Sequence, residues 1–256
     1  MQIESSVLVD RAATLRAAHD ADEPLVVPNA WDVASAQLVE AAGFPVVATT
    51  SGGVANALGY ADGEAIPPGL MFDAIARIAG AVSVPVTADI EAGYGLPATE
   101  LVERLLTAGA VGINLEDSDR RGDAPLVPTE VHAARVADVK AAGRSAGVDI
   151  VVNARVDVYA RQVEPMLELA LERGRAYVDA GADCVFPILV RDETDIAALV
   201  AGLGTVNVLW RKGWPSIARL AELGVRRVSF GSGIFRASVD HVDDVVRRIK
   251  SGTYEG

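Results

Sequence analysis

Short apolar runs alternate along the chain with longer segments in which apolar residues recur three or four positions apart. The longer pattern places apolar side chains on one face of a helix, as in segments 100–108 and 166–180. The short runs are rich in valine, isoleucine and leucine, which is typical of strands covered on both faces in a parallel sheet. Strands are predicted at residues 25–28, 46–50, 86–89, 112–116, 150–154, 183–186, 206–209 and 227–230.

Several helix-like segments end in a glycine directly before the next predicted strand. These glycines are Gly43, Gly109, Gly181 and Gly224. A glycine in the left-handed conformation ends a helix and turns the chain back. The repeat of strand, helix and glycine predicts an α/β fold, a (β/α)8 TIM-type barrel formed by a single domain over residues 1–256. An open doubly wound sheet is the alternative, but no Gly-x-Gly-x-x-Gly motif opens the first helix.

Composition and charge narrow the class of protein. Half of the 256 residues are apolar, which is enough for one large core. The net charge of −12 argues against nucleic acid and acidic membrane surfaces as partners. No apolar run approaches the roughly 18 residues of a membrane span, and no signal peptide is recognisable, so we expect a cytoplasmic protein. The single cysteine, Cys184, excludes an internal disulfide and a cysteine-rich zinc site.

Polar residues follow six of the predicted strands, at the ends where a barrel carries its chemistry. They are Asn29 and Asp32, Thr49 to Gly53, Asp89 and Glu91, Asn114 with Glu116 and Asp117, Asn153 with Arg155 and Asp157, and Asn207. Buried polar groups need partners or a ligand, so their convergence on one rim predicts a functional site.

Asp89 and Glu91 are two residues apart, which places both side chains on the same side of an extended chain. Two carboxylates held close together repel each other unless a cation is present. Oxygen ligands suit Mg²⁺ or Mn²⁺, so the pair is a candidate metal site. The alternative is that both are solvated loop acids that cap the following helix.

Short motifs at these strand ends follow one another in a recognisable order. They are Pro-Asn-Ala-Trp-Asp at 28–32, Thr-Ser-Gly-Gly at 50–53, Gly-Tyr-Ala-Asp-Gly at 59–63, Ala-Asp-Ile-Glu-Ala-Gly-Tyr-Gly at 88–95, Gly-Ile-Asn-Leu-Glu-Asp at 112–117 and Asn-Ala-Arg-Val-Asp at 153–157. The set resembles the isocitrate lyase and phosphoenolpyruvate mutase superfamily over nearly the whole chain.

The resemblance implies a Mg²⁺-dependent enzyme that acts on a small α-oxo or α-hydroxy carboxylic acid through an enolate of the pyruvate type. By position, Asp89 would bind the metal directly, and Asp62, Glu91 and Glu116 would hold its waters. Arg155 would stabilise charge on the substrate's C2 oxygen or bind a second anionic group, with Asp62 and Glu116 as the other catalytic residues. Substrate contacts are expected at Thr49, Ser51, Gly52, Gly53, Arg155, Asn207 and Trp31. For two of these residues a plainer interpretation stays open: Asp62 could belong to a turn, and Arg155 could pair only with Asp157.

The segment 118–128 departs from the superfamily pattern. The carbon–carbon lyases carry a Lys-Lys-Cys-Gly-His or Lys-Arg-Cys-Gly-His loop there, whereas this chain has no cysteine, which disfavours isocitrate or 2-methylisocitrate cleavage by the usual route. The segment also lacks Asn, Thr and Lys, so phosphorus–carbon chemistry loses support. Decarboxylation of an oxaloacetate-like acid needs little beyond the common core, because the enolate is itself the leaving product.

We therefore expect a carbon–carbon lyase or oxaloacetate-type decarboxylase with segment 118–128 as a mobile lid. The alternatives are a phosphonopyruvate mutase or hydrolase and a catalytically weak oxo-acid-binding protein. The resemblance also implies a homo-oligomer, a dimer or tetramer, and leaves open whether the helix expected at 239–249 is exchanged between subunits. Arg211 and Lys212 replace a small apolar stretch of the family, and either add positive charge to the pocket or lie on its rim. His19, His132 and His241 are expected at the surface.

Overall fold

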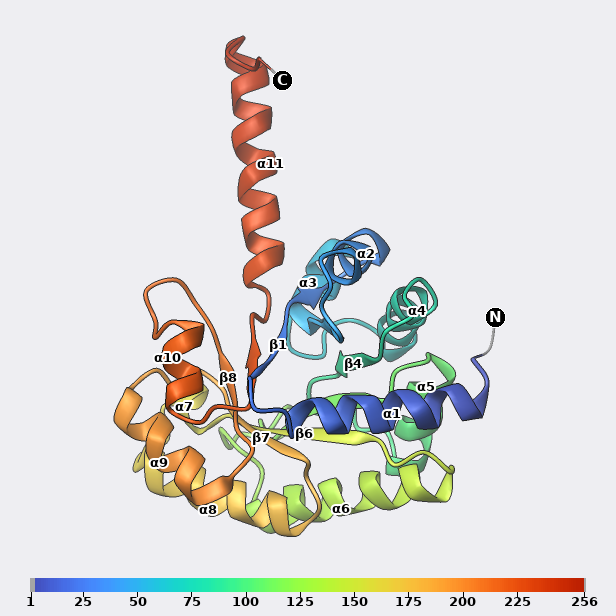
Figure 1. Cartoon of the computed structure of the whole chain (residues 1–256), viewed down its shortest axis with the longest axis vertical. Coiled ribbons are helices and arrows are strands. Elements are labelled where there is room, and N and C mark those ends of the chain that lie inside the picture. The colour runs from blue at the N-terminus through green and yellow to red at the C-terminus, as the bar shows by residue number, and fades with distance from the viewer. Residues whose placement is uncertain (1–2, 256) are drawn as a thin grey trace.

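The computed structural model describes residues 3–255, and its strands occur where the apolar runs predict them (Figure 1). They are β1 (Leu25–Val27), β2 (Asn29–Ala30), β3 (Val47–Thr49), β4 (Val86–Asp89), β5 (Gly112–Glu116), β6 (Val151–Val156), β7 (Cys184–Pro187), β8 (Asn207–Leu209) and β9 (Arg227–Ser229). All of their pairings are parallel.

The strands form the predicted TIM-type barrel, although its hydrogen bonding is interrupted in two places. One sheet has the order β2-β3-β4-β5-β6-β7 and the other the order β1-β9-β8. Pro28, the last residue of the predicted first strand, separates β1 from β2, so the chain passes from one sheet to the other there. On the other side, a single bridge between Val185 and Val206 joins the sheets. The side chain of Asn29 also spans the division, donating to the Thr49 carbonyl (2.8 Å) and accepting from the Phe230 N–H (2.8 Å).

Helices connect the strands and cover the barrel. They are α1 (Ser5–His19), α2 (Val33–Ala41), α3 (Ser51–Ala57), α4 (Pro68–Ala79), α5 (Ala98–Thr107), α6 (Thr129–Ser145), α7 (Val158–Arg161), α8 (Met166–Asp179), α9 (Glu193–Leu203), α10 (Ile217–Glu222) and α11 (Gly233–Ser251). The four glycines expected to end helices all have positive φ, between 83° and 98°. Within residues 3–255, no helix is both long and apolar enough to cross a membrane.

Two histidines expected at the surface are buried, which corrects that prediction. His19 is 4% exposed and His132 is 3% exposed. They lie on the inner faces of α1 and α6. Burial is the main cause that lowers the pKa of each imidazole to about 4, so both are neutral near pH 7.

The last helix, α11, extends away from the barrel (Figure 1). It begins earlier than the predicted 239–249 and contains no buried residue. Its exposed apolar side chains recur at helical spacing, at Val239, Val242, Val246 and Ile249. This spacing places them along one side of the helix.

Candidate functional site

A cavity of about 140 Å³ lies at the carboxyl ends of the strands. The predicted residues that line it are Asn29, Thr50, Ser51, Asp62, Asp89, Asn114, Arg155 and Arg211. A larger groove of about 760 Å³ lies between α4 and α5, away from the strand ends. We assign the site to the smaller cavity because carboxylate, amide, hydroxyl and guanidinium groups from different strands converge on it.

Asp89, at the end of β4, has one oxygen held by the protein and one without a partner. The Ser51 N–H (3.0 Å) and hydroxyl (2.8 Å) both donate to Oδ2 of Asp89. Oδ1 of Asp89 is buried and has no hydrogen-bond partner among the described residues. A buried carboxylate oxygen without a donor is costly, so this atom marks a place where a ligand would fit.

Ser51 reaches Asp89 because the Thr-Ser-Gly-Gly motif forms the beginning of α3. Thr50 is the N-cap of this helix, and its hydroxyl accepts a hydrogen bond from the Gly53 N–H (3.4 Å). The two glycines permit close packing. A Cβ on Gly52 would lie 2.8 Å from Oγ of Ser232, and one on Gly53 would lie 2.5 Å from Cγ2 of Thr50.

Glu91 is buried beside the other acids of the site. Its carboxylate accepts hydrogen bonds from the Glu64 N–H (2.7 Å) and the Tyr94 hydroxyl (3.2 Å). Burial first, and then the charges of Asp89, Glu116 and Asp62, raise the pKa of Glu91 to about 8. Glu91 is therefore close enough to interact with each of the other three predicted metal-site carboxylates.

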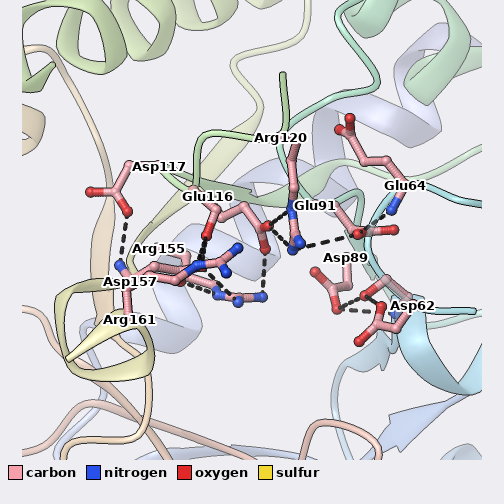
Figure 2. A network of polar contacts seen from close by, with 12 residues as sticks. Asp62, Glu64, Asp89, Glu91, Glu116, Asp117, Arg120, Arg155, Asp157 and Arg161 are labelled. Carbon is pink, nitrogen blue, oxygen red and sulfur yellow. Dashed lines mark hydrogen bonds and ion pairs between the residues drawn. The ribbon is translucent and has the colours of Figure 1, made fainter. Parts of the chain in front are cut away.

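Two arginines supply positive charge to this acidic cluster (Figure 2). Nη1 of Arg155 lies 2.6 Å from Oε2 of Glu116, and its Nε donates to Asp157 (2.6 Å). Nε of Arg120 donates to Glu116 (2.9 Å), and its Nη2 lies 3.7 Å from Glu91. Arg155 thus pairs with Glu116 as well as Asp157 and still lines the cavity.

The donor set fits a metal bound through few protein ligands. Within residues 3–255, no three His, Cys, Asp or Glu side chains form a cage of direct ligands. Mg²⁺ commonly binds through one or two carboxylates and keeps several waters. The unpartnered oxygen of Asp89 would be available as a direct ligand, and Asp62, Glu91 and Glu116 are the acids that could hold such waters.

Other predicted substrate residues do not line the cavity. Thr49 accepts a hydrogen bond from the Asp89 N–H (2.9 Å), and Trp31 packs edge-on against Phe235 with ring centroids 5.3 Å apart. Asn207 is fully buried and donates to Ser229 (3.3 Å), while its Oδ1 has no described partner. Gly52 and Gly53 lie within α3.

Sequence reasoning missed several residues around the site. They are Glu64, Tyr94, Arg120, Ser232 and Arg236. Arg120 lies in the segment expected to be a lid. Its signal in the sequence is that it is the first basic residue after Glu116 along the chain. Arg236 follows the last strand closely, which is a position that the barrel rule itself identifies.

Behind the cavity, Asp117 forms a buried network that joins the ends of β5 and β6. Its Oδ1 accepts from the Asp157 N–H (2.8 Å), and its Oδ2 accepts from the Tyr177 hydroxyl (2.7 Å) and from Arg173 (3.0 Å). Burial is the main cause that raises the pKa of Asp117. The ring of His132 packs edge-on against Tyr177.

Comparisons with known proteins agree with this geometry. Residues 15–250 match the family model described as phosphoenolpyruvate phosphomutase. An uncharacterized protein of Mycobacterium tuberculosis is 34% identical over 91% of this chain and 88% of its own, and 2-methylisocitrate lyase of Escherichia coli is 31% identical over 82% and 69%. The solved structure of oxaloacetate acetylhydrolase in complex with the product oxalate has a TM-score of 0.86 and 25% identity, and the match covers 96% of this chain and 89% of that one. The strand-end motifs, the barrel and the matched length together show that this chain belongs to the phosphoenolpyruvate phosphomutase family.

Proposed function

We propose that the protein is a Mg²⁺-dependent enzyme that cleaves a carbon–carbon bond in a small α-oxo or α-hydroxy acid through a pyruvate-type enolate. The observation that carries this proposal is the unpartnered oxygen of Asp89, which lines the same cavity as Arg155. The family includes relatives described as lyases and as mutases, so the fold alone does not select the reaction.

The protein's own groups have distinct tasks in this proposal. Ser51 orients Asp89 through two hydrogen bonds, which fixes the direction of the free oxygen. In an α-oxo acid, Arg155 stabilises negative charge on the C2 oxygen when the electron pair of the broken bond moves toward it. In an α-hydroxy acid, it stabilises the deprotonated C2 oxygen, whose electron pair forms the new C=O while the pair of the broken bond leaves with the other fragment. Mg²⁺, when bound, supplies a Lewis acid that polarises the same oxygen. Mn²⁺ would serve the same purpose.

Asp62, Glu91 and Glu116 would hold the metal's waters, and their mutual repulsion is relieved when a cation binds. The substrate's carboxylate would lie at the start of α3, beside Ser51, which lines the cavity, while Gly52 and Gly53 let this end of the helix pack closely. Thr49, Asn207 and Trp31 support the wall behind these groups, since each makes its described contacts with protein neighbours.

The segment 118–128 is proposed as the lid over the cavity. It lacks helix and regular strand and is pinned at its base by a bridge between Ser118 and Leu126. Arg120 extends from it to Glu116 and Glu91. Closure over a bound acid would exclude water from the enolate.

The test is pyruvate release from oxaloacetate, 2-methylisocitrate, dimethylmalate and phosphonopyruvate in the presence of Mg²⁺. We expect turnover of oxaloacetate, 2-methylisocitrate or dimethylmalate, and we expect this turnover to fall to background in Asp89→Ala. Asp73→Ala is the matched control, because Asp73 is an exposed aspartate in the larger groove between α4 and α5. Full activity of Asp89→Ala, or loss in Asp73→Ala alone, would refute the assignment of the site.

Other outcomes separate the alternative functions. Phosphate formed from phosphonopyruvate would identify a phosphonate hydrolase, and phosphoenolpyruvate formed from it would identify a mutase. The mutase remains an alternative because the matching family model is described as phosphoenolpyruvate phosphomutase. Mg²⁺-dependent binding of oxo acids without turnover would identify a catalytically weak binding protein. Either result would replace carbon–carbon cleavage as the proposed activity.

We also propose that the protein is a cytoplasmic homo-oligomer. The support is α11, which has no buried residue and carries four exposed apolar side chains along one side. A second copy of the chain would remove these side chains from water. Sedimentation at micromolar concentration should therefore show a dimer or tetramer, and a monomer would contradict the proposal.

A further inference from the structure

Arg120 binds two of the four predicted metal-site acids, as Figure 2 shows. Its Nε (2.9 Å) and Nη2 both donate to Oε1 of Glu116, and Nη2 also lies 3.7 Å from Oε2 of Glu91. The side chains of Glu116 and Glu91 are 1% and 2% exposed, whereas that of Arg120 is 23% exposed. The guanidinium therefore compensates two carboxylates that water scarcely reaches.

The other donors to these two acids come from outside the lid. A backbone N–H and a tyrosine hydroxyl donate to Glu91, and Nη1 of Arg155, in β6, lies 2.6 Å from Oε2 of Glu116. Arg120 instead belongs to the segment 118–128, which lacks helix and regular strand. A change in the position of this segment would therefore withdraw Arg120 from the acids and leave their other donors in place.

The contacts of Arg120 conflict with the task that the proposed function gives to the same acids. In that function Glu91 and Glu116 hold waters of the metal, and each such water must donate to a carboxylate oxygen. Oε1 of Glu116 already accepts two hydrogen bonds from Arg120, which is about as many as one oxygen can accept. A dication and a guanidinium at the same acids also repel each other. Arg120 and a hydrated metal thus compete for one place.

We propose that Arg120 is a competing cation of the metal site, which occupies Glu91 and Glu116 and leaves them when Mg²⁺ binds. This inference rests on the proposed function, which places the metal at Asp89. Because Arg120 belongs to the lid, its departure releases the lid from the acids. Metal binding and lid position are then linked, so the factor by which the docked arginine weakens Mg²⁺ binding equals the factor by which Mg²⁺ weakens docking.

The neighbouring arginine of the lid provides a matched control. The guanidinium of Arg121 packs against Gly95, whose positive φ of 61° and missing side chain leave room for it. Within residues 3–255, Arg121 forms no ion pair. Replacement of Arg121 therefore removes one positive charge from the lid without removing a contact with the acids.

The first measurement is calorimetric titration of Mg²⁺ into the protein without any organic acid. We expect Arg120→Gln to bind Mg²⁺ about tenfold more tightly than the wild type, within the range of roughly 5–150-fold that is typical of coupled sites. Arg120→Lys keeps the charge, and Arg121 is exposed, so Arg120→Lys and Arg121→Gln should change the affinity by less than about threefold. Damage to the site by the substitution would weaken binding, so a gain in affinity separates competition from a structural role.

The second measurement is limited digestion with trypsin, because the exposed Arg121 precedes Gly122 in the lid. Saturating Mg²⁺ should accelerate cleavage after Arg121 in the wild type by about the factor found in calorimetry, since cleavage follows the population of the released lid. In Arg120→Gln, cleavage should be fast both with and without Mg²⁺. In Asp89→Ala, it should stay slow in both conditions.

The inference and the proposed function fail in different ways. Equal Mg²⁺ affinity in the wild type and Arg120→Gln, or lid cleavage in the wild type that Mg²⁺ leaves unchanged or slows, would overturn the inference while the metal site stands. No Mg²⁺ binding by the wild type, or equal binding by Asp89→Ala, would refute the metal site itself.

Discussion

Removal of the Tyr177 hydroxyl tests the buried network behind the site. Tyr177 is fully buried, and its hydroxyl donates to Asp117 at 2.7 Å while it accepts from Arg173 at 3.0 Å. In Tyr177→Phe, Asp117 keeps two of its three donors, the Asp157 N–H and Arg173. A hydrogen bond to a charged group contributes about 1.5–3 kcal/mol, and water cannot replace it at a buried position. We therefore expect the free energy of unfolding to fall by about 2 kcal/mol.

The measurement is urea unfolding followed by tryptophan fluorescence, with thermal unfolding as a second readout. For a chain of this size, 2 kcal/mol corresponds to a decrease in Tm of about 4–8 °C. Tyr159→Phe is the matched control, because its hydroxyl also donates to a carboxylate, that of Asp195 at 2.9 Å, but in a half-buried setting. Its cost should stay below about 1 kcal/mol. Equal losses in the two variants would refute the reasoning, since burial of the network would then contribute nothing.

Two further predictions concern stability. Because the folded-state pKa of His132 is about 4, below the ordinary 6.5, the unfolded chain binds more protons between these values. The free energy of unfolding should therefore decrease as pH falls from 7 to 5. Over that interval, His132→Asn should lose about 2 kcal/mol less of this free energy than the wild type. If the urea midpoints of the two proteins changed with pH in parallel, this sign would be contradicted. Gly53→Ala should lower the free energy of unfolding in urea by about 1–3 kcal/mol, because its Cβ would meet Thr50. Gly69→Ala, on the open side of α4, should be neutral or stabilising. Equal effects of the two substitutions would disprove the close packing at Gly53.

The strands could be predicted from the sequence because both faces of a barrel strand are covered. Val46, Val47 and Ala48 are therefore all apolar and buried, and Gly43 precedes them with a positive φ. The beginning of α3 was not predicted, because its local sequence disfavours the structure that it adopts. Two consecutive glycines argue against a helix by propensity, yet Gly53 is required there because it packs against Thr50 and Trp31.

The helical spacing of apolar residues indicates that His19 is buried, although histidine is a polar residue that is usually expected at the surface. The inner face of α1 consists of Leu8, Ala12, Leu15 and His19, which follow helical spacing. The spacing thus placed His19 in the core, but polar neighbours favoured an exposed position. Where spacing and residue type disagree, a buried histidine that remains neutral satisfies both.

The contacts between site residues were harder to predict than their positions. Ser51 and Asp89 are 38 positions apart, and their hydrogen bonds depend on the register of β3 and β4, in which Val47 pairs with Val86. Register follows from backbone hydrogen bonding, which a list of strand ends does not specify. The division of arginines into those with and without acidic partners likewise depends on contacts between distant segments.

The adjacent acids Glu116 and Asp117 show why a motif does not assign the same role to each of its members. Glu116 faces Arg120 and Arg155 at the acidic cluster, whereas Asp117 faces Arg173 and Tyr177 on the helix side. Successive residues at the end of a strand point to opposite sides, so one carboxylate belongs to the proposed chemistry and the other to the support behind it. The two roles are connected through Asp157, whose N–H binds Asp117 and whose side chain holds Arg155. A change at Asp117 would therefore alter activity only through the orientation of Arg155, and would lower stability at the same time.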